Sequence, residues 1–145
     1  MGIKGETCIG FLESSQEFLL SAELVLNKTH GVFLPAYFLL GRSIELSLKA
    51  FLLHRGLPIK ELRKKKYGHN LVTLLNESLN KGIEKEIAIN NVEKGVIELL
   101  SYDYADKRFE YRITGGQYCL PLIDVTCEIA KKLAFMDLNN LCYPD

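Results

Sequence analysis

The fold of this chain is decided by residues 35–56, which read PAYFLLGRSIELSLKAFLLHRG. Proline suits the first turn of a helix and glycine the position just past its end, so Pro35 and Gly56 mark the ends of one long helix. Its apolar residues recur at intervals of three and four and form two stripes on different sides. The first stripe is Tyr37, Leu40, Ile44, Leu48 and Phe51, and the second is Leu39, Leu46, Ala50 and Leu53. A helix that is apolar on nearly every side is buried, so we expect the other helices to pack around it.

One narrow strip of this helix is charged. Arg42, Glu45 and Lys49 are three and four residues apart and therefore share a face. Two interpretations are open. The strip is either the single solvated edge of the helix, with Glu45 and Lys49 as an ordinary ion pair, or a part of an interface or ligand groove. We favour the solvated edge.

Similar apolar spacing predicts further helices at about residues 8–27, 69–81, 91–102 and 121–140. In the helix at 91–102, the expected apolar face consists of Val92, Val96, Leu99 and Leu100. Between the last two helices, Phe109, Tyr111 and Ile113 alternate with polar residues, which predicts an extended piece in an irregular segment. We therefore expect an all-α, up-and-down bundle of four long helices, with a shorter fifth helical element and an irregular segment before the last helix. The 145 residues favour one domain, with an ordered core at about 8–140.

Composition narrows the classes of function. Eighteen basic residues balance eighteen acidic ones, so no global field attracts nucleic acid. The charged strip interrupts the longest apolar run, and no secretory signal is visible, so we expect no membrane association. The cysteines show no Cys-x-x-Cys spacing and are expected to be reduced thiols in a cytoplasmic protein; they are Cys8, Cys119, Cys127 and Cys142. The scattered histidines and cysteines predict no metal site, and we expect no cofactor.

Two stretches resemble the HEPN family, whose name refers to nucleotide binding in higher eukaryotes and prokaryotes. They are ELSLKAFL at residues 45–52, followed by Gly56, and GHNLVTLL at residues 68–75. Family members carry a Glu-x-x-x-Lys-Ala helix, a glycine and a Thr/Gly-His-Asp-Leu-x-x-Leu-Leu helix start. Asn70 stands here where Asp is common, and Tyr111-Arg112-Ile113 lacks the proline of the family's Arg-Tyr-Pro segment. The resemblance covers about residues 9–140, and its motifs are mainly structural.

This resemblance implies a helical bundle that forms a homodimer. It implies a non-catalytic module that binds a nucleotide, RNA or a protein partner such as a nucleotidyltransferase, in a toxin–antitoxin, defence or stress system. The alternative is a metal-independent endoribonuclease acting as a dimer, because family ribonucleases use an Arg-x(4–6)-His motif and five residues separate Arg63 from His69. In that role the histidine moves a proton at the ribose 2′-hydroxyl and the arginine stabilises the phosphorane-like charge. His69 also belongs to the helix start that non-catalytic members share, so we favour a structural role for it.

The only dense basic run offers a second candidate site. It consists of Lys60, Arg63, Lys64, Lys65 and Lys66. Together with Arg112, these side chains could hold the phosphates of RNA or a nucleotide. Most short charge runs are solvated loops, and that interpretation is the one we favour.

Overall fold

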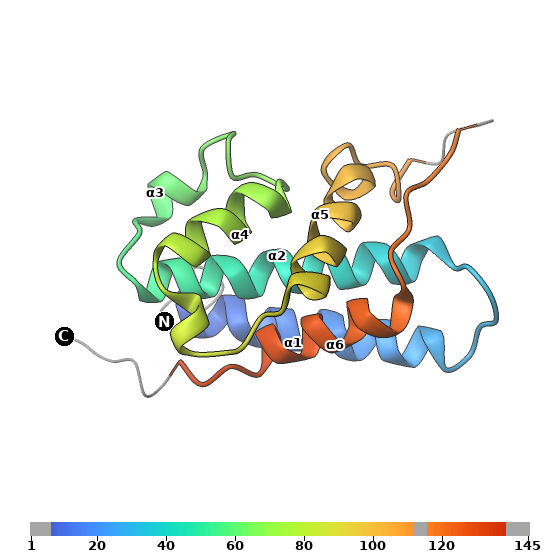
Figure 1. Cartoon of the computed structure of the whole chain (residues 1–145), viewed down its shortest axis with the longest axis horizontal. Helices are drawn as coiled ribbons and strands as arrows, with labels where there is room; N and C mark the ends of the chain where they lie inside the picture. Colours follow the sequence, from blue (N-terminus) through green and yellow to red (C-terminus); the bar gives the residue numbers. More distant parts are fainter. Residues whose placement is uncertain (1–6, 112–115, 139–145) are drawn as a thin grey trace.

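The helix expected from residues 35–56 is the central element of the structure. The computed structural model describes residues 7–111 and 116–138, and this helix is α2, Leu34–His54 (Figure 1). Pro35 lies in its first turn, and Gly56, with a φ of +94°, follows its end, as predicted. The whole first stripe is buried. The helices α1, α4, α5 and α6 all pack against α2, which confirms its central position.

The helix α1, Cys8–Leu26, forms the most extensive pairing with α2 and runs antiparallel to it (Figure 1). The Thr7 side chain caps its first turn by accepting a hydrogen bond from the Gly10 amide. Small polar residues bring the two helices together, because the buried Ser43 hydroxyl on α2 donates to the Ser15 carbonyl oxygen on α1 at 2.7 Å. Hydroxyls that bond to backbone carbonyls are satisfied inside a core, so serine is tolerated there.

Three short elements follow α2. They are α3, Ile59–Leu62; α4, Leu71–Asn80; and the 3-10 turn η2, Ile83–Lys85. Asn70 caps α4 as predicted, its side-chain oxygen accepting a hydrogen bond from the Thr73 amide at 3.1 Å. The single turn of α3 lies in the connection between α2 and α4, so it supplies the shorter helical element.

The helix α5, Asn91–Ala105, is longer than predicted and buries a different face. Asn90 and Glu93 form a capping box at its start. Val92 and Leu99 are exposed, so their assignment to the core face was wrong, whereas Val96 and Leu100 are buried as expected. The face that packs also contains polar side chains, namely Glu93, Ser101, Asp103 and Tyr104. A search for apolar spacing overlooks such a face because buried polar residues interrupt it.

The chain after α5 folds into consecutive turns at residues 106–110, so the extended piece predicted there was wrong for the described residues. Asp103 and Arg108 stabilise these turns, because their side chains form an ion pair at 3.1 Å. The Asp103 carboxylate also accepts a hydrogen bond from the Cys119 amide at 2.6 Å. Phe109 stacks between Tyr37 and Tyr118, with ring centroids 5.9 and 6.1 Å away. Residues 116–122 have no regular secondary structure, which confirms an irregular segment before the last helix. Ile113 lies outside the described residues.

The last helix, α6, spans Ile123–Ala134 and is shorter than the predicted 121–140. Met136 and Leu138 are buried beyond its end, while Asp137 between them is exposed. This alternation is that of an extended chain lying on the core. The apolar spacing of Leu133 and Met136 fits a helix equally well, so the sequence pattern alone placed the helix end too late.

The other helices surround α2 (Figure 1). The helices α1 and α6 contact each other as well as α2, and so do α4 and α5; α5 also packs against α6, where Lys132 pairs with Glu93 at 2.9 Å. The described residues form helices and no strands, so the predicted all-α bundle is confirmed. Within residues 7–111 and 116–138, no helix combines the length and the apolar character needed to cross a bilayer.

Candidate functional site

The charged strip of α2 surrounds a buried carboxylate. The Glu45 side chain is 1% exposed, so a solvated edge was the wrong interpretation for this residue. Its Oε2 accepts hydrogen bonds from Lys49 Nζ at 2.8 Å and from Arg42 Nη1 at 3.2 Å. Its Oε1 accepts one from the Tyr104 hydroxyl at 2.6 Å and lies 2.8 Å from His69 Nδ1. These four partners replace the water that a buried carboxylate has lost.

The network favours the ionised form of Glu45. Burial alone would raise the pKa of this carboxyl, but the charge of Lys49 and the hydrogen bonds from His69, Lys49 and Tyr104 outweigh it and lower the pKa. Burial, followed by the negative charge of Glu45, raises the pKa of the Tyr104 phenol far above its usual range. Tyr104 therefore stays protonated and donates to Glu45.

The ionised state of Glu45 also sets the tautomer of His69. A carboxylate only accepts hydrogen bonds, so His69 Nδ1 must be the donor in the 2.8 Å contact. When His69 is neutral, its Nε2 consequently carries the lone pair. The His69 side chain is 40% exposed, which leaves part of the ring accessible to solvent.

Gly41 makes room for the Tyr104 ring. A Cβ on Gly41 would lie 2.7 Å from Tyr104 Cε1 and still closer to Cδ1, so a larger residue would displace the ring. Tyr104 comes from the last turn of α5, and its ring is nearly perpendicular to the His69 ring, with the centroids 5.9 Å apart. The glycine on α2 thus positions a tyrosine on α5 to reach Glu45.

A cavity of about 240 Å³ opens beside this network. It is lined by Phe11, Arg42, Glu45, Lys49, Ile59, Leu62, Arg63, Gly68 and His69. Three helices and the segment between α3 and α4 contribute. Phe11 comes from α1, the charged strip from α2, and Ile59 and Leu62 from α3. Arg63 directly follows α3, and Gly68 and His69 precede α4. Three cationic side chains face one carboxylate here, so the lining has an excess of positive charge. The chemistry suits an anionic ligand.

The structure brings together five of the residues singled out in the sequence: Arg42, Glu45, Lys49, Arg63 and His69. The other basic residues of the run do not line this cavity. Lys64 and Lys66 pair with Glu61 at 2.9 and 3.8 Å, and their side chains are largely exposed. The hydrogen bond from Lys64 lowers the pKa of Glu61. Desolvation opposes this change, and the charges of Lys64 and Lys66 add to it. Lys60 and Lys65 are also exposed. Arg112 lies outside the described residues.

Sequence reasoning missed Tyr104 and Phe11 as parts of this site. Both are separated from α2 in sequence, and neither belongs to a local motif. The only available signal was Gly41, a glycine inside a strongly apolar helix, which is typical of a close approach by another element. In the described residues, no group of three or more His, Cys, Asp or Glu side chains is placed to hold a metal ion.

Comparisons with known proteins give no family assignment. No family model matches the sequence, and neither a curated protein nor a solved structure matches it.

Proposed function

We propose that the cavity beside Glu45 binds a phosphate group of RNA or of a nucleotide. The observation that carries this proposal is the convergence of Arg42, Lys49 and Arg63 on one small cavity with His69 at its wall. Guanidinium and ammonium groups are the usual protein ligands of phosphate. Glu45 holds the cations of α2 in place, since it bonds to both Arg42 and Lys49.

The size of the cavity supports a phosphate and not a whole nucleotide. Pockets for drug-sized ligands occupy about 300–1,000 Å³, and this cavity has a volume of about 240 Å³. The rest of an RNA or nucleotide ligand would therefore lie outside the cavity. Lys60, Lys64, Lys65 and Lys66 are exposed near the same loop and could attract the flanking phosphates.

This ligand fits the expectation of a non-catalytic HEPN-type module. In that role the protein is a cytoplasmic homodimer that acts with a nucleotide, RNA or a partner such as a nucleotidyltransferase, in a toxin–antitoxin, defence or stress system. The contact between His69 Nδ1 and Glu45 supports a structural role for His69, because it ties the loop before α4 to α2. Asn70, the next residue, caps α4, so the loop is anchored at both positions.

The second candidate is a metal-independent endoribonuclease. It is favoured by the Glu45–His69 contact of 2.8 Å and by the position of His69 and Arg63 in one cavity. Because the Glu45 carboxylate accepts a hydrogen bond from Nδ1–H, the lone pair lies on Nε2, which can accept a proton from a ribose 2′-hydroxyl. Arg63 would then stabilise the negative charge that develops on the phosphorus oxygens.

One set of variants tests both candidates with a short, fluorescently labelled RNA. Arg63→Ala should weaken binding by about tenfold, because it removes a cation of the cavity. Lys28→Ala is the matched control, since Lys28 is exposed and lies outside the cavity. Replacing Lys64, Lys65 and Lys66 together by Ala should weaken binding less and reduce its salt dependence. If Arg63→Ala binds RNA as tightly as Lys28→Ala, the phosphate proposal is wrong.

The same RNA distinguishes the binding module from the nuclease. We expect no metal-independent cleavage by the wild-type protein, and a lower free energy of unfolding in His69→Ala. RNA cleavage that disappears in both Arg63→Ala and His69→Ala, while both variants stay folded by circular dichroism, would establish the nuclease instead. A lower free energy of unfolding in His69→Ala, together with no RNA cleavage by the wild type, would identify His69 as structural.

A further inference from the structure

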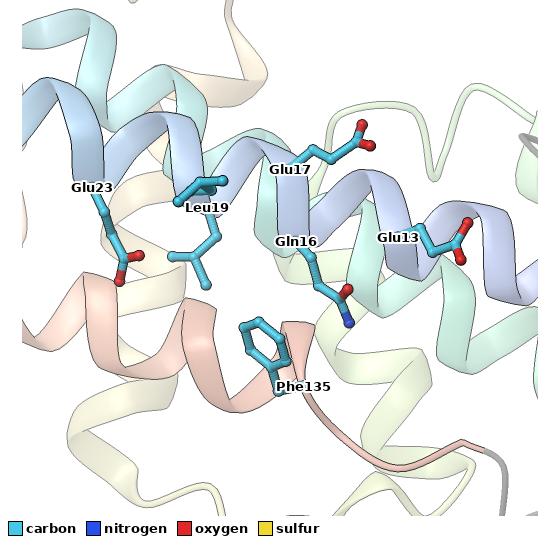
Figure 2. Close-up of a pocket in the computed structure, with 7 residues that line it drawn as sticks. Glu13, Gln16, Glu17, Leu19, Glu23 and Phe135 are labelled. Carbon is cyan, nitrogen blue, oxygen red and sulfur yellow. The ribbon is translucent and has the colours of Figure 1, made fainter.

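A second, larger hollow lies between α1 and the end of α6. Its volume is about 520 Å³, and its lining consists of Glu13, Gln16, Glu17, Leu19, Leu20, Glu23 and Phe135. Figure 2 shows the Phe135 ring reaching from the end of α6 toward Leu19 and Gln16 of α1. We call this hollow the α1/α6 groove. It shares no lining residue with the cavity beside Glu45.

Apolar side chains are exposed along this groove. Leu20 is 56% exposed and Phe135 is 60% exposed, and Leu24, one helical turn beyond Leu20, is 58% exposed. Leu19 forms a buried floor beneath them. Large apolar side chains gathered at a concave surface are typical of a site that another molecule covers. The groove therefore offers an apolar contact area along the outer face of α1.

Carboxylates accompany these apolar side chains. Glu13 and Glu17 are one turn apart on α1, and neither forms an ion pair within the described part of the chain. Glu23 has Lys131 of α6 as a partner at 3.7 Å, with both side chains well exposed. Surface pairs of this kind contribute little, so Lys131 can turn to another acceptor. The groove thus combines apolar contacts with unbalanced negative charge.

We propose that the α1/α6 groove docks a cationic amphipathic helix of another protein. Leu20, Leu24 and Phe135 would receive the apolar face of that helix, and Glu13, Glu17 and Glu23 would pair with its lysines or arginines. This is the helix-in-groove mode of recognition, with the charges fixing the orientation of the bound helix. The contact residues from Glu13 to Leu24 span roughly 16 Å of α1, so the partner needs about three helical turns.

The charge of the groove argues against two other occupants. A symmetric contact with a second copy of this chain would bring Glu13, Glu17 and Glu23 of one protomer against the same carboxylates of its partner. Like charges placed opposite each other at an interface disfavour binding. RNA is disfavoured for the same reason, because its phosphates are negative. Only a partner with positive charge beside an apolar stripe satisfies both features of the groove.

The test uses a labelled synthetic peptide of about four helical turns, with leucines at helical spacing and lysines beside them. Its affinity for the full chain is measured by fluorescence anisotropy. A second peptide has the same composition in an order that destroys the leucine stripe, and a third has glutamate in place of lysine. We expect the wild-type protein to bind the first peptide at least about tenfold more tightly than either of the others.

Variants of the protein then locate the binding site. Two double variants change the groove itself. One combines Leu20→Ser with Leu24→Ser, and the other combines Glu13→Gln with Glu17→Gln. Each should weaken peptide binding by about tenfold. Matched controls are Val92→Ser with Leu99→Ser, and Glu98→Gln with Glu110→Gln, because these residues are exposed elsewhere. The control pairs should stay within about twofold of the wild type.

Several results would overturn the proposal. One is equal binding of the two lysine peptides, which would show attraction by charge alone. A second is that the double variants in the groove bind the peptide as tightly as the control double variants. A third is that the wild-type protein shows no binding at peptide concentrations up to about 1 mM. A wild-type dimer that Leu20→Ser with Leu24→Ser converts to a monomer would show that a second copy covers the groove instead.

Discussion

At the scale of single residues, the buried carboxylate of Glu45 joins three parts of the chain. It bonds to its own helix through Arg42 and Lys49, to the loop before α4 through His69 and to α5 through Tyr104. A buried ion pair contributes little net stability compared with apolar packing, but removing one partner leaves the other charge poorly solvated. Glu45 is therefore more important for the arrangement of its neighbours than for stability as such.

The lowered pKa of Glu45 predicts an acid-dependent stability. A carboxyl whose pKa is lower in the folded state stabilises the protein above its unfolded pKa, near the ordinary value of 4.5. That stability is lost as the pH falls through the folded-state pKa. We expect Glu45→Gln to reduce the free energy of unfolding by about 1–3 kcal/mol at neutral pH. The difference from the wild type should shrink as the pH falls below about 4.5 in urea titrations.

The control for this titration is Glu98→Gln, because Glu98 is exposed. Its difference from the wild type should be small at every pH. A difference between Glu45→Gln and the wild type that stays constant down to about pH 3 would contradict a lowered pKa of Glu45.

Two helical glycines give a second prediction at this scale. Gly41→Ala should lower the free energy of unfolding by about 1–3 kcal/mol, because the new Cβ overlaps the Tyr104 ring and pushes it away from Glu45. Gly95→Ala is the matched control, since a Cβ on Gly95 meets nothing within 4 Å. That change should raise the stability by up to about 1 kcal/mol, because alanine favours a helix more than glycine does. Equal effects of the two substitutions in thermal unfolding would rule out the close approach of Tyr104.

At the scale of elements, α2 supports every other long helix. The helices α1, α4, α5 and α6 all pack against it, so it is their common surface (Figure 1). Within the charged strip, Glu45 is covered by His69 from the loop before α4 and by Tyr104 from α5.

Truncating the core of α2 should be costly. Ile44→Ala and Leu48→Ala should each lower the free energy of unfolding by about 2–5 kcal/mol, because both residues are fully buried and each truncation leaves a cavity. Val92→Ala on the exposed face of α5 serves as the control and should change the free energy of unfolding by less than about 1 kcal/mol. Losses below about 1 kcal/mol at both α2 positions, measured by urea unfolding, would mean that α2 is not central.

At the scale of the whole molecule, a net charge of zero conceals two surfaces of opposite sign. The cavity beside Glu45 has an excess of cations, and the α1/α6 groove has an excess of carboxylates. The two surfaces share no residue, so a phosphate ligand and a cationic partner helix could bind to the same protein together. Under this arrangement, each ligand is directed to its own site by charge.

The proposed homodimer is a prediction at this scale. Tyr102 and Tyr111 are exposed, and the Arg108 guanidinium lies 5.8 Å from the centroid of the Tyr102 ring. Tyrosine and arginine are enriched at protein interfaces. We expect light scattering to give twice the monomer mass of 16.4 kDa at protein concentrations of roughly tens of micromolar. A monomer mass at those concentrations would contradict the homodimer. Tyr102→Ser with Tyr111→Ser should shift the equilibrium toward the monomer, and Val32→Ser should not.

Much of the fold could be predicted from the sequence because it depends on local chemistry. Pro35 and Gly56 bound the central helix, Asn70 caps α4, and apolar spacing identifies the buried stripes. These signals act within a few residues, where helical geometry alone determines which side chains share a face. For the same reason the strip Arg42, Glu45 and Lys49 could be recognised as one surface before its surroundings were known.

The tertiary structure alone decided what surrounds that strip. Glu45 is separated in sequence from Tyr104 by 59 positions and from His69 by 24. No local spacing in the sequence encodes either contact. The same limit explains the errors in α5 and α6, where buried polar residues and an extended continuation replace the expected apolar pattern. A carboxylate is stable inside a protein only when distant donors converge on it, so its environment is a property of packing and not of the sequence around it.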